Sequence, residues 1–304
     1  MSLESQVAGD TALQGAVQAK PRSEWSLAWG RLYRNKGALV GGAVLIVMAT
    51  GAIFADVIAT EGLDYYNVPG ALLPPGTDGH VFGTDDIGRD VFSRVVRGAR
   101  ISLRIGFTAV AIGAFFGSIL GLVAGYFGRW PDMLISRVLD IMLAFPSLLL
   151  AITIVAGLGP GLNNAMIALG IAGIPGYARV VRGTTLSARE FTYVRAARAV
   201  GMRDLRVIFR HILPNVVSPI LILATLGLGT NMLSAAGLSF LGLGAGPPEP
   251  EWGLELSLNR NYFRTAWWIP TFNGLALAIT VFAINLFGDG LREALDPQAS
   301  AWTG

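Results

Sequence analysis

Long apolar runs alternate with shorter polar segments along most of the chain. An α-helix rises about 1.5 Å per residue, so about 20 apolar residues cross the roughly 30 Å of hydrocarbon in a bilayer. Six runs approach or exceed this length, and an even number of crossings returns both termini to the same side. The pattern predicts an all-α membrane protein with six transmembrane helices, at residues 37–59, 102–127, 133–157, 165–181, 216–236 and 270–287.

The composition agrees with this pattern and excludes several classes of protein. The 304 residues are 53% hydrophobic and 14% charged, with a mean hydropathy of +0.55, which is too apolar for an ordinary soluble domain. The chain has no cysteine, which excludes disulfides and thiolate metal sites. With two histidines, His80 and His211, a histidine metal cluster is excluded as well, so we expect no metal site. Nothing resembles a nucleic-acid-binding face of basic and aromatic residues.

One stretch, residues 177–215, is far more basic than the rest of the chain. It carries eight arginines against two acids, Glu190 and Asp204, and long apolar runs flank it on both sides. Such a segment cannot lie in hydrocarbon, and the positive-inside rule predicts that it lies in the cytoplasm, as do both termini. The arginines are at positions 179, 182, 189, 195, 198, 203, 206 and 210.

The middle of this stretch predicts two short helices joined by a tight turn. Residues 191–200 have helical composition, and Gly201 can end that helix in a left-handed conformation. Asp204 can cap a second helix over residues 205–212, and Pro214 is expected to end it because proline lacks an amide proton. The predicted product is a compact helical projection that a soluble partner can grip.

The same residues resemble the EAA loop of the permease subunits of ABC importers. That pattern is Glu-Ala-Ala, three residues, Gly, nine residues, Ile, one residue and Leu-Pro. Here Arg195 replaces the glutamate and His211 occupies the isoleucine position. In the family this loop is the coupling helix that docks into a cleft of the ATPase subunit; the alternative is a basic loop that only orients the protein. The resemblance implies these ATPase-coupling residues: Arg195, Ala196, Ala197, Arg198, Gly201, Asp204, Leu213 and Pro214.

Two further strings resemble the dipeptide, oligopeptide and nickel branch of this family. They are HVFGTDDIGRDVFSRVVRGARISL, which begins at His80, and NLFGDGLREALDP, which begins at Asn285. The resemblance implies a type I ABC importer permease fold in the bacterial inner membrane. It also implies a second homologous permease subunit, two ABC ATPase subunits and an extracytoplasmic substrate-binding protein. Peptides are the expected cargo, and nickel chelates remain open.

The chain itself shows no sign of catalysis. It has no Walker lysine motif to hold ATP phosphates and no constellation of nucleophile, base and orienting group. We therefore expect no cofactor in this chain, with ATP and Mg on the partner ATPase subunits. The main rival from another class is an ion-coupled secondary transporter. Such proteins usually carry ionisable residues at the middle of the membrane, and the centres of the predicted spans lack them. A membrane scaffold that transports nothing is a third alternative.

The predicted spans divide the chain into five regions. Residues 1–36 form a cytoplasmic tail with an interfacial helix, because Trp25, Trp29, Leu32 and Tyr33 share one helical face. The first transmembrane helix covers 37–59, a periplasmic segment 60–98, a five-helix permease core 99–290 with the coupling loop at 184–215, and a cytoplasmic tail 291–304.

The periplasmic prediction conflicts with the number of arginines near its end. Five arginines, at 89, 94, 97, 100 and 104, strain the positive-inside rule, although acids between Glu61 and Asp90 offset them. Asp85, Asp86 and Asp90 lack the spacing of a calcium loop, so an ion-paired turn is favoured. The loop after the fifth span carries Glu249, Glu251 and Glu255 with several aromatics, which indicate contact with a partner or the bilayer surface.

Small residues within the spans predict contacts between helices, and polar residues there are candidates to line a passage. Gly113, Gly117, Gly121 and Gly125 recur at intervals of four on one face of the second span, which predicts a close helix contact. Pro146 is expected to bend the third span, where Asp140 should pair with an arginine. In the fifth span, Thr230, Asn231 and Ser234 are candidates to line a passage; alternatively, the hydroxyls bond carbonyls of their own helix.

Overall fold

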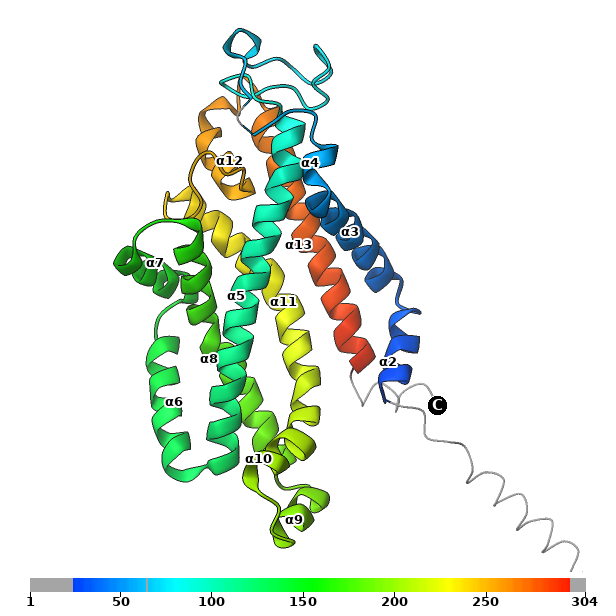
Figure 1. Cartoon of the computed structure of the whole chain (residues 1–304), viewed down its shortest axis with the longest axis vertical. Coiled ribbons are helices and arrows are strands. Elements are labelled where there is room, and N and C mark those ends of the chain that lie inside the picture. The colour runs from blue at the N-terminus through cyan, green and yellow to red at the C-terminus, as the bar shows by residue number, and fades with distance from the viewer. Residues whose placement is uncertain (1–23, 64, 296–304) are drawn as a thin grey trace, which may run out of the picture.

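The computed structural model describes residues 24–63 and 65–295 as an elongated bundle of helices (Figure 1). Residues 1–23 and 296–304, which belong to the two predicted tails, lie outside the described residues. Five helical units in the described ranges are long and apolar enough to cross a membrane, and α6 with α7 makes a sixth if that bent pair counts as one. The five are α3 (Lys36–Ile53), α5 (Val91–Phe127), α8 (Leu162–Ala188), the unit Asp204–Phe240 and α13 (Trp268–Leu295).

The central helix, α5, packs most extensively against α8 and also contacts α11 (Leu213–Phe240) and α3. On one side of this centre, α13 packs against α3 and α11; on the other, α7 packs against α8 (Figure 1). Apolar clusters fill the contacts. One of them joins Ile105 of α5 to Val155 of α7, Leu169 of α8 and Leu238 of α11.

The predicted third span is not one straight helix. It consists of α6 (Arg129–Leu143) and α7 (Ser147–Leu158), which meet at an angle of 92°. Pro146 stands immediately before α7, where the absence of an amide proton prevents α6 from continuing. The proline therefore breaks the helix rather than only bending it. Asp140 of α6 contacts Arg179 of α8 at 2.9 Å, which is the arginine pairing that the sequence predicts.

Several helices extend beyond the predicted spans because polar residues continue them past the apolar runs. α5 begins at Val91, where the Asp90 carboxylate accepts the Ser93 amide at 2.7 Å and caps the helix. α8 continues through Pro175 to Ala188, so the first five residues of the predicted coupling loop are helical. α13 continues to Leu295, beyond the predicted start of the C-terminal tail.

Pro214 does not end a helix, contrary to the prediction. α10 (Asp204–Val207), a π-helical turn (Ile208–Ile212) and α11 follow one another without a break. The Leu213 amide bonds the Ile208 carbonyl across the π turn, and Pro214 lies in the first turn of α11. The π turn shifts the backbone hydrogen bonding by one residue, which lets the helix continue through a residue that has no amide proton.

The N-terminal helix α2 (Glu24–Leu32) packs on the end of α13. Leu32 is buried with Ala38 and Ala294, whereas the rings of Trp29 and Tyr33 are exposed and meet edge to face at 5.5 Å. The predicted apolar face is thus split between the bundle and its surroundings. The side chain of Trp25 lies outside the described residues.

The external loop after α11 folds back into the bundle through α12 (Trp252–Leu258). Trp252, one of the aromatics of this loop, is buried there together with Glu251 and Glu255, so its contacts lie within the chain and not with a partner or the bilayer surface. Trp268 is also buried and donates to the Thr84 carbonyl at 3.1 Å, which ties α13 to the external segment before α5. Phe263 and Trp267 are more than half exposed.

Candidate coupling surface and passage groove

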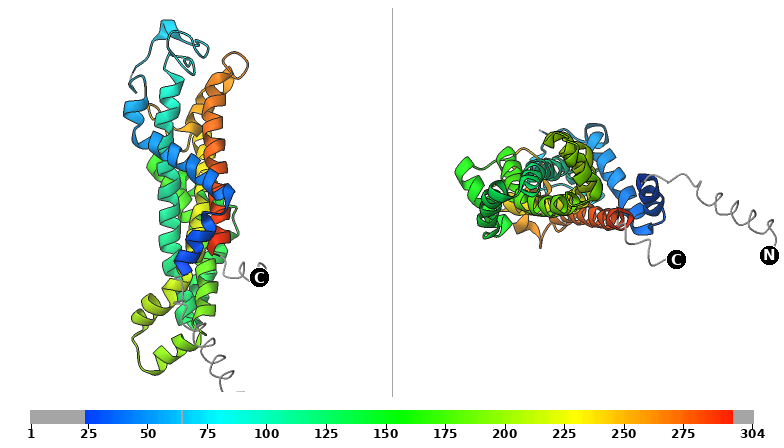
Figure 2. Two further views of the ribbon diagram at one scale, coloured as in Figure 1. Left: turned by 90° about the vertical axis from the view of Figure 1, so that its right-hand side faces the viewer. Right: turned by 90° about the horizontal axis from the view of Figure 1, so that it is seen from below.

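A short helical projection, formed by α9 (Thr192–Ala199), the turn at Gly201, α10 and the π turn, extends past one end of the bundle (Figure 2). We call it the coupling projection. Gly201 follows α9 with φ of +80°, a left-handed conformation that favours glycine. The Gly201 amide bonds the Arg198 carbonyl at 3.0 Å and the Met202 amide bonds the Ala197 carbonyl at 3.1 Å. These two bonds form a Schellman motif, so the turn between the helices has one defined shape.

The outer surface of the coupling projection combines exposed apolar side chains with positive charge. Val200, Leu205 and Phe209 are 80%, 68% and 64% exposed. Large apolar side chains gathered in this way mark a surface that a partner covers. The projection also exposes five arginines, Arg195, Arg198, Arg203, Arg206 and Arg210, and of the predicted alanine pair Ala196 is exposed and Ala197 buried.

The coupling projection is fixed to the lower end of α5 through Tyr126. The Tyr126 hydroxyl donates to the Asp204 carboxylate at 2.6 Å, and the Arg198 guanidinium lies 4.3 Å from the centre of the Tyr126 ring. The prediction that Asp204 caps α10 is wrong. Asp204 is the first residue of α10, and its carboxylate accepts the tyrosine hydroxyl instead. Arg203 occupies the cap position and makes no side-chain capping bond. Beneath these contacts, Val194 and Val207 are fully buried.

The four glycines of α5 lie where α8 approaches most closely. A Cβ atom on Gly117 would lie 2.8 Å from the Ile174 carbonyl oxygen, and one on Gly121 would lie 2.6 Å from the Ala178 carbonyl oxygen. At Gly113 and Gly125 the nearest backbone oxygens, those of Gly170 and Arg182, would be at 3.2 and 2.9 Å. The stripe thus lets the backbone of α8, together with the first side-chain atoms of Tyr177, Val181 and Thr185, lie directly on the backbone of α5.

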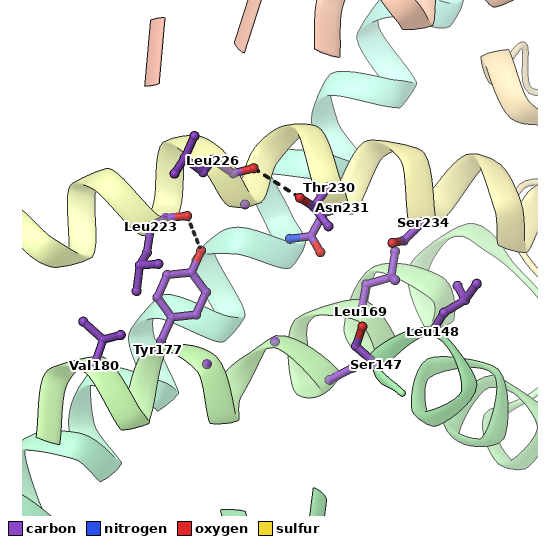
Figure 3. Close-up of a pocket in the computed structure, with 14 residues that line it drawn as sticks. Ser147, Leu148, Leu169, Tyr177, Val180, Leu223, Leu226, Thr230, Asn231 and Ser234 are labelled. Carbon is purple, nitrogen blue, oxygen red and sulfur yellow. Dashed lines mark hydrogen bonds between the residues drawn. The ribbon is translucent and has the colours of Figure 1, made fainter. Parts of the chain in front are cut away.

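A groove of about 500 Å³ opens between α8 and α11, with the start of α7 at its edge (Figure 3). Thr230, Asn231 and Ser234 all line it, and Figure 3 shows Asn231 and Ser234 directed from α11 toward α8. The Thr230 hydroxyl bonds the Leu226 carbonyl of its own helix at 3.4 Å, the alternative that the sequence leaves open. The walls are otherwise mainly apolar, with Tyr177 of α8 donating to the Leu223 carbonyl at 3.3 Å.

The external arginines are almost all neutralised within the chain. Arg94 is 4% exposed and its Nε donates to the Glu255 carboxylate at 2.8 Å. Arg89 pairs with Asp85 at 2.5 Å and Arg100 pairs with Asp56 at 2.9 Å. These bonds neutralise arginines that the sequence predicts to be periplasmic and that strain the positive-inside rule.

The external turn before α5 is built on carboxylates. The Asp85 side chain accepts the amides of Ile87 and Arg89 at 3.0 and 2.9 Å, in addition to the Arg89 guanidinium. Burial raises the pKa of Asp90, but hydrogen bonds from Ser93, His80 and Thr60 outweigh it and leave the pKa of Asp90 below its ordinary value of 3.8. Both carboxylates therefore hold backbone and side-chain donors, as in the ion-paired turn that the sequence favours.

Two protein-family profiles cover most of the chain. The profile described as "Binding-protein-dependent transport system inner membrane component" matches residues 117–301. The chain belongs to this family of permease subunits. A second profile, "N-terminal TM domain of oligopeptide transport permease C", matches residues 23–75 and so includes α2 and α3.

Relatives align along nearly the whole permease. The chain is 50% identical to the dipeptide transport system permease protein DppC of Alkalihalophilus pseudofirmus, over 91% of this chain and 90% of that protein. It is 44% identical to the di/tripeptide transport system permease protein DppC of Pseudomonas aeruginosa, over 89% and 91%. It is 42% identical to the glutathione transport system permease protein GsiD of Pectobacterium atrosepticum, over 91% and 92%. The resemblance to the peptide branch of ABC-importer permeases is therefore confirmed.

The fold also resembles solved ABC importers. A chain of the MetNI methionine ABC transporter, in a crystal form described as inward facing, superposes with a TM-score of 0.53 at 21% identity, covering 67% of this permease and 96% of that chain. The likeness confirms the predicted all-α permease fold of a multi-pass membrane protein. Together the findings support the ABC permease over an ion-coupled secondary transporter.

Sequence reasoning missed the residues that join distant parts of this permease. Tyr126 has no special signal, since a tyrosine at the end of a span normally indicates an interfacial anchor. Arg94 and Glu255 are 161 positions apart, so no local pattern pairs them. Tyr177 was the first residue of the basic stretch, but its place in the groove depends on how α8 and α11 pack.

Proposed function

We propose that this permease forms half of the passage of an ATP-driven importer for di- or oligopeptides in the bacterial inner membrane. Its relatives are named for dipeptide, di/tripeptide and glutathione transport, and they align over 89–91% of this permease. A nickel-chelate importer is the second candidate within the family. The observation that carries the proposal is the coupling projection, with exposed apolar side chains surrounded by arginines at one end of an apolar bundle.

The coupling projection docks into the ATPase subunit. Val200, Leu205 and Phe209 supply apolar area, and the surrounding arginines attract acidic groups of the ATPase. Arg195, Ala196 and Ala197 lie on α9, while Gly201 and Asp204 set the turn and its attachment. Leu213 and Pro214 connect the projection to α11, so a displacement of the docked ATPase acts directly on a helix that lines the groove.

ATP and Mg belong to two partner ATPase subunits in this proposal. When nucleotide draws the ATPases together, they push the coupling projections of two permease subunits toward each other. The helices then pivot as rigid bodies and open the passage to the outside, where a binding protein releases its cargo. This permease does no chemistry itself.

The proposed orientation places the coupling projection and both termini in the cytoplasm. Figure 1 shows α2, the end of α13 and the coupling projection toward the same end of the bundle, which fits an even number of crossings. The arginines of the projection lie at that end, as the positive-inside rule requires. The loops before α5 and around α12 then face the periplasm.

The groove between α8 and α11 is one wall of the passage. A second homologous permease subunit closes it from the other side. Asn231 and Ser234 offer hydrogen bonds to the peptide backbone, while the mainly apolar wall tolerates varied side chains. Tyr177 braces the two helices by its bond to the Leu223 carbonyl.

Reconstitution tests the proposed function. The permease, its partner permease and ATPases, placed in vesicles with the binding protein, should take up labelled di- and tripeptides when ATP is present and no ion gradient exists. Uptake of a nickel chelate in place of peptides would establish the second candidate. Uptake that requires an ion gradient and no ATP would refute the proposal.

Docking is tested separately by two variants. Gly201→Val places a branched side chain at φ of +80°, and Arg198→Glu reverses a charge on the projection's surface. Both should reduce co-purification of the ATPase while the permease stays in the membrane. Gly183→Ala is the matched control, since Gly183 has open space around it and lies outside the projection. Unchanged recovery of the ATPase with both variants would contradict the docking role.

A further inference from the structure

The external end of the permease holds a second groove. It has a volume of about 590 Å³ and lies between α5, the turn joining α7 to α8, and the loop that follows α11. Its polar lining comes from Arg104 of α5, Asn163 and Asn164 at the start of α8, and Glu249 of the loop. We call it the outer groove.

Among the five arginines between positions 89 and 104, Arg104 is the one without a partner in the described residues. The guanidinium groups of Arg89, Arg94, Arg97 and Arg100 all contact carboxylates or carbonyl oxygens. Within residues 24–63 and 65–295, the exposed side chain of Arg104 makes no hydrogen bond or ion pair. A guanidinium forms strong, charge-assisted hydrogen bonds with a carboxylate, so an unneutralised guanidinium in a groove points to a ligand with negative charge.

Glu249 brings the opposite charge to the same groove. Its side chain is exposed and makes no ion pair or hydrogen bond among the described residues, and it does not pair with Arg104. Two opposite charges that share a groove without neutralising each other are complementary to a ligand with a charge at each end. Asn163 lines the same groove and offers an amide that can donate to and accept from a peptide bond.

We propose that the outer groove receives a short zwitterionic peptide between the binding protein and the passage. The Arg104 guanidinium donates hydrogen bonds to the peptide carboxylate, and the Glu249 carboxylate accepts hydrogen bonds from the ammonium group. The inference rests on the proposed function and adds to it a site and a requirement for free termini. The volume lies within the range of about 300–1,000 Å³ that small-ligand sites occupy.

The outer groove lies close enough to the groove of the passage for a peptide to move from one to the other. Leu162 lines the outer groove and Leu169 lines the groove of the passage. The two residues are seven apart on α8, which places them on the same helical face about 10 Å from each other. A peptide leaving the outer groove therefore needs to move only about two helical turns along α8 to reach the passage wall.

The test measures ATP-driven uptake into vesicles that contain the complete transporter. The binding protein is supplied at saturation and already loaded with a tripeptide that has free termini, a C-amidated form or an N-acetylated form. Arg104→Gln should lower uptake of the free tripeptide about tenfold, the loss of one charge-assisted contact, and change uptake of the C-amidated form less than twofold. Glu249→Gln should show the same contrast with the N-acetylated form.

Two control variants keep the test decisive. Arg264→Gln removes an exposed external arginine outside the outer groove and should leave uptake of all three peptides unchanged. Arg104→Lys keeps the charge and should recover most of the uptake. Equal losses for free and blocked peptides in Arg104→Gln and Glu249→Gln would overturn the inference; weaker binding of unloaded binding protein to these variants would then assign the two charges to its docking. If the wild-type transporter moves none of the peptides, the proposed function fails together with the inference.

Discussion

The contact between α5 and α8 predicts that replacing glycine by alanine destabilises the permease at one position and slightly stabilises it at another. A methyl group on Gly121 would lie 2.6 Å from the Ala178 carbonyl oxygen, whereas one on Gly183 of α8 would meet nothing within 4 Å. Ordinary contact begins at 3.4 Å, so Gly121→Ala requires the backbones to separate by about 0.8 Å at this point. A backbone carbonyl cannot rotate away as a flexible side chain can.

The expected magnitude follows from overpacking and helix propensity. Overpacking costs about 1–3 kcal/mol, and replacing glycine by alanine within a helix returns about 0.5–1 kcal/mol. Gly121→Ala should therefore lose about 1–2 kcal/mol net, while Gly183→Ala should gain slightly. For proteins of comparable size, about 2–4 °C in Tm corresponds to each kcal/mol, so Gly121→Ala should melt about 2–8 °C lower than wild type.

The assay compares the two variants side by side. Each permease is heated in the same detergent, and the fraction that stays monodisperse is measured by size-exclusion chromatography. Gly183→Ala measures the effect of helix propensity alone, because the added methyl group contacts no other atom. If Gly121→Ala is as stable as Gly183→Ala, the two backbones do not touch as described, and the stripe is not the contact that fixes α5 on α8.

Three further predictions concern the external end of the permease and the coupling projection. Glu255→Ala leaves the Arg94 guanidinium buried without its carboxylate and should cost about 3–5 kcal/mol, seen as a large fall in Tm. Asp90→Ala removes the cap of α5 and should cost about 1 kcal/mol of stability at pH 7. The pKa of Asp90 is lower in the folded permease than its ordinary value of 3.8, so the stabilisation by Asp90 is complete above pH 3.8 and is lost as the pH falls through the folded pKa. The Tm values of wild type and variant should therefore converge at strongly acidic pH. Leu205→Ser and Phe209→Ser should change the stability of the isolated permease by less than about 0.5 kcal/mol, because both side chains are exposed. Both variants should nevertheless reduce the amount of ATPase that co-purifies. A large fall in Tm would show instead that the two side chains pack within the chain.

The sequence predicts those features of the fold that local chemistry determines. Apolar runs indicate where helices cross the bilayer, and the left-handed turn at Gly201 follows from a glycine after a helical segment. The four-residue spacing of small residues in α5 indicates a contact face on that helix. None of these needs information from elsewhere in the chain.

The features that sequence reasoning got wrong depend on contacts between distant segments. Pro214 should stop a helix by its own chemistry, but the π turn before it lets α10 and α11 continue. Asp204 was expected to cap α10, but Tyr126, at the end of a different helix, provides a competing donor at 2.6 Å. Glu255 looked like an acid of an exposed loop because its partner, Arg94, is 161 residues away. In each case tertiary packing outweighs a local preference.

The two tyrosines that sequence reasoning missed bear on how movement passes through the permease. In the proposed function, a push on the coupling projection reaches the proposed passage only through parts that do not deform. Tyr126 ties the projection to α5, and the glycine stripe holds the backbone of α5 closely against α8. By contrast, α6 and α7 meet at 92° across Pro146, where the chain has no continuous helix to transmit force. Displacement of the projection should therefore move α5, α8 and α11 as one body, because Tyr177 holds α8 to α11. The break at Pro146 should let α7, at the edge of the groove, change its angle to α6 during this movement.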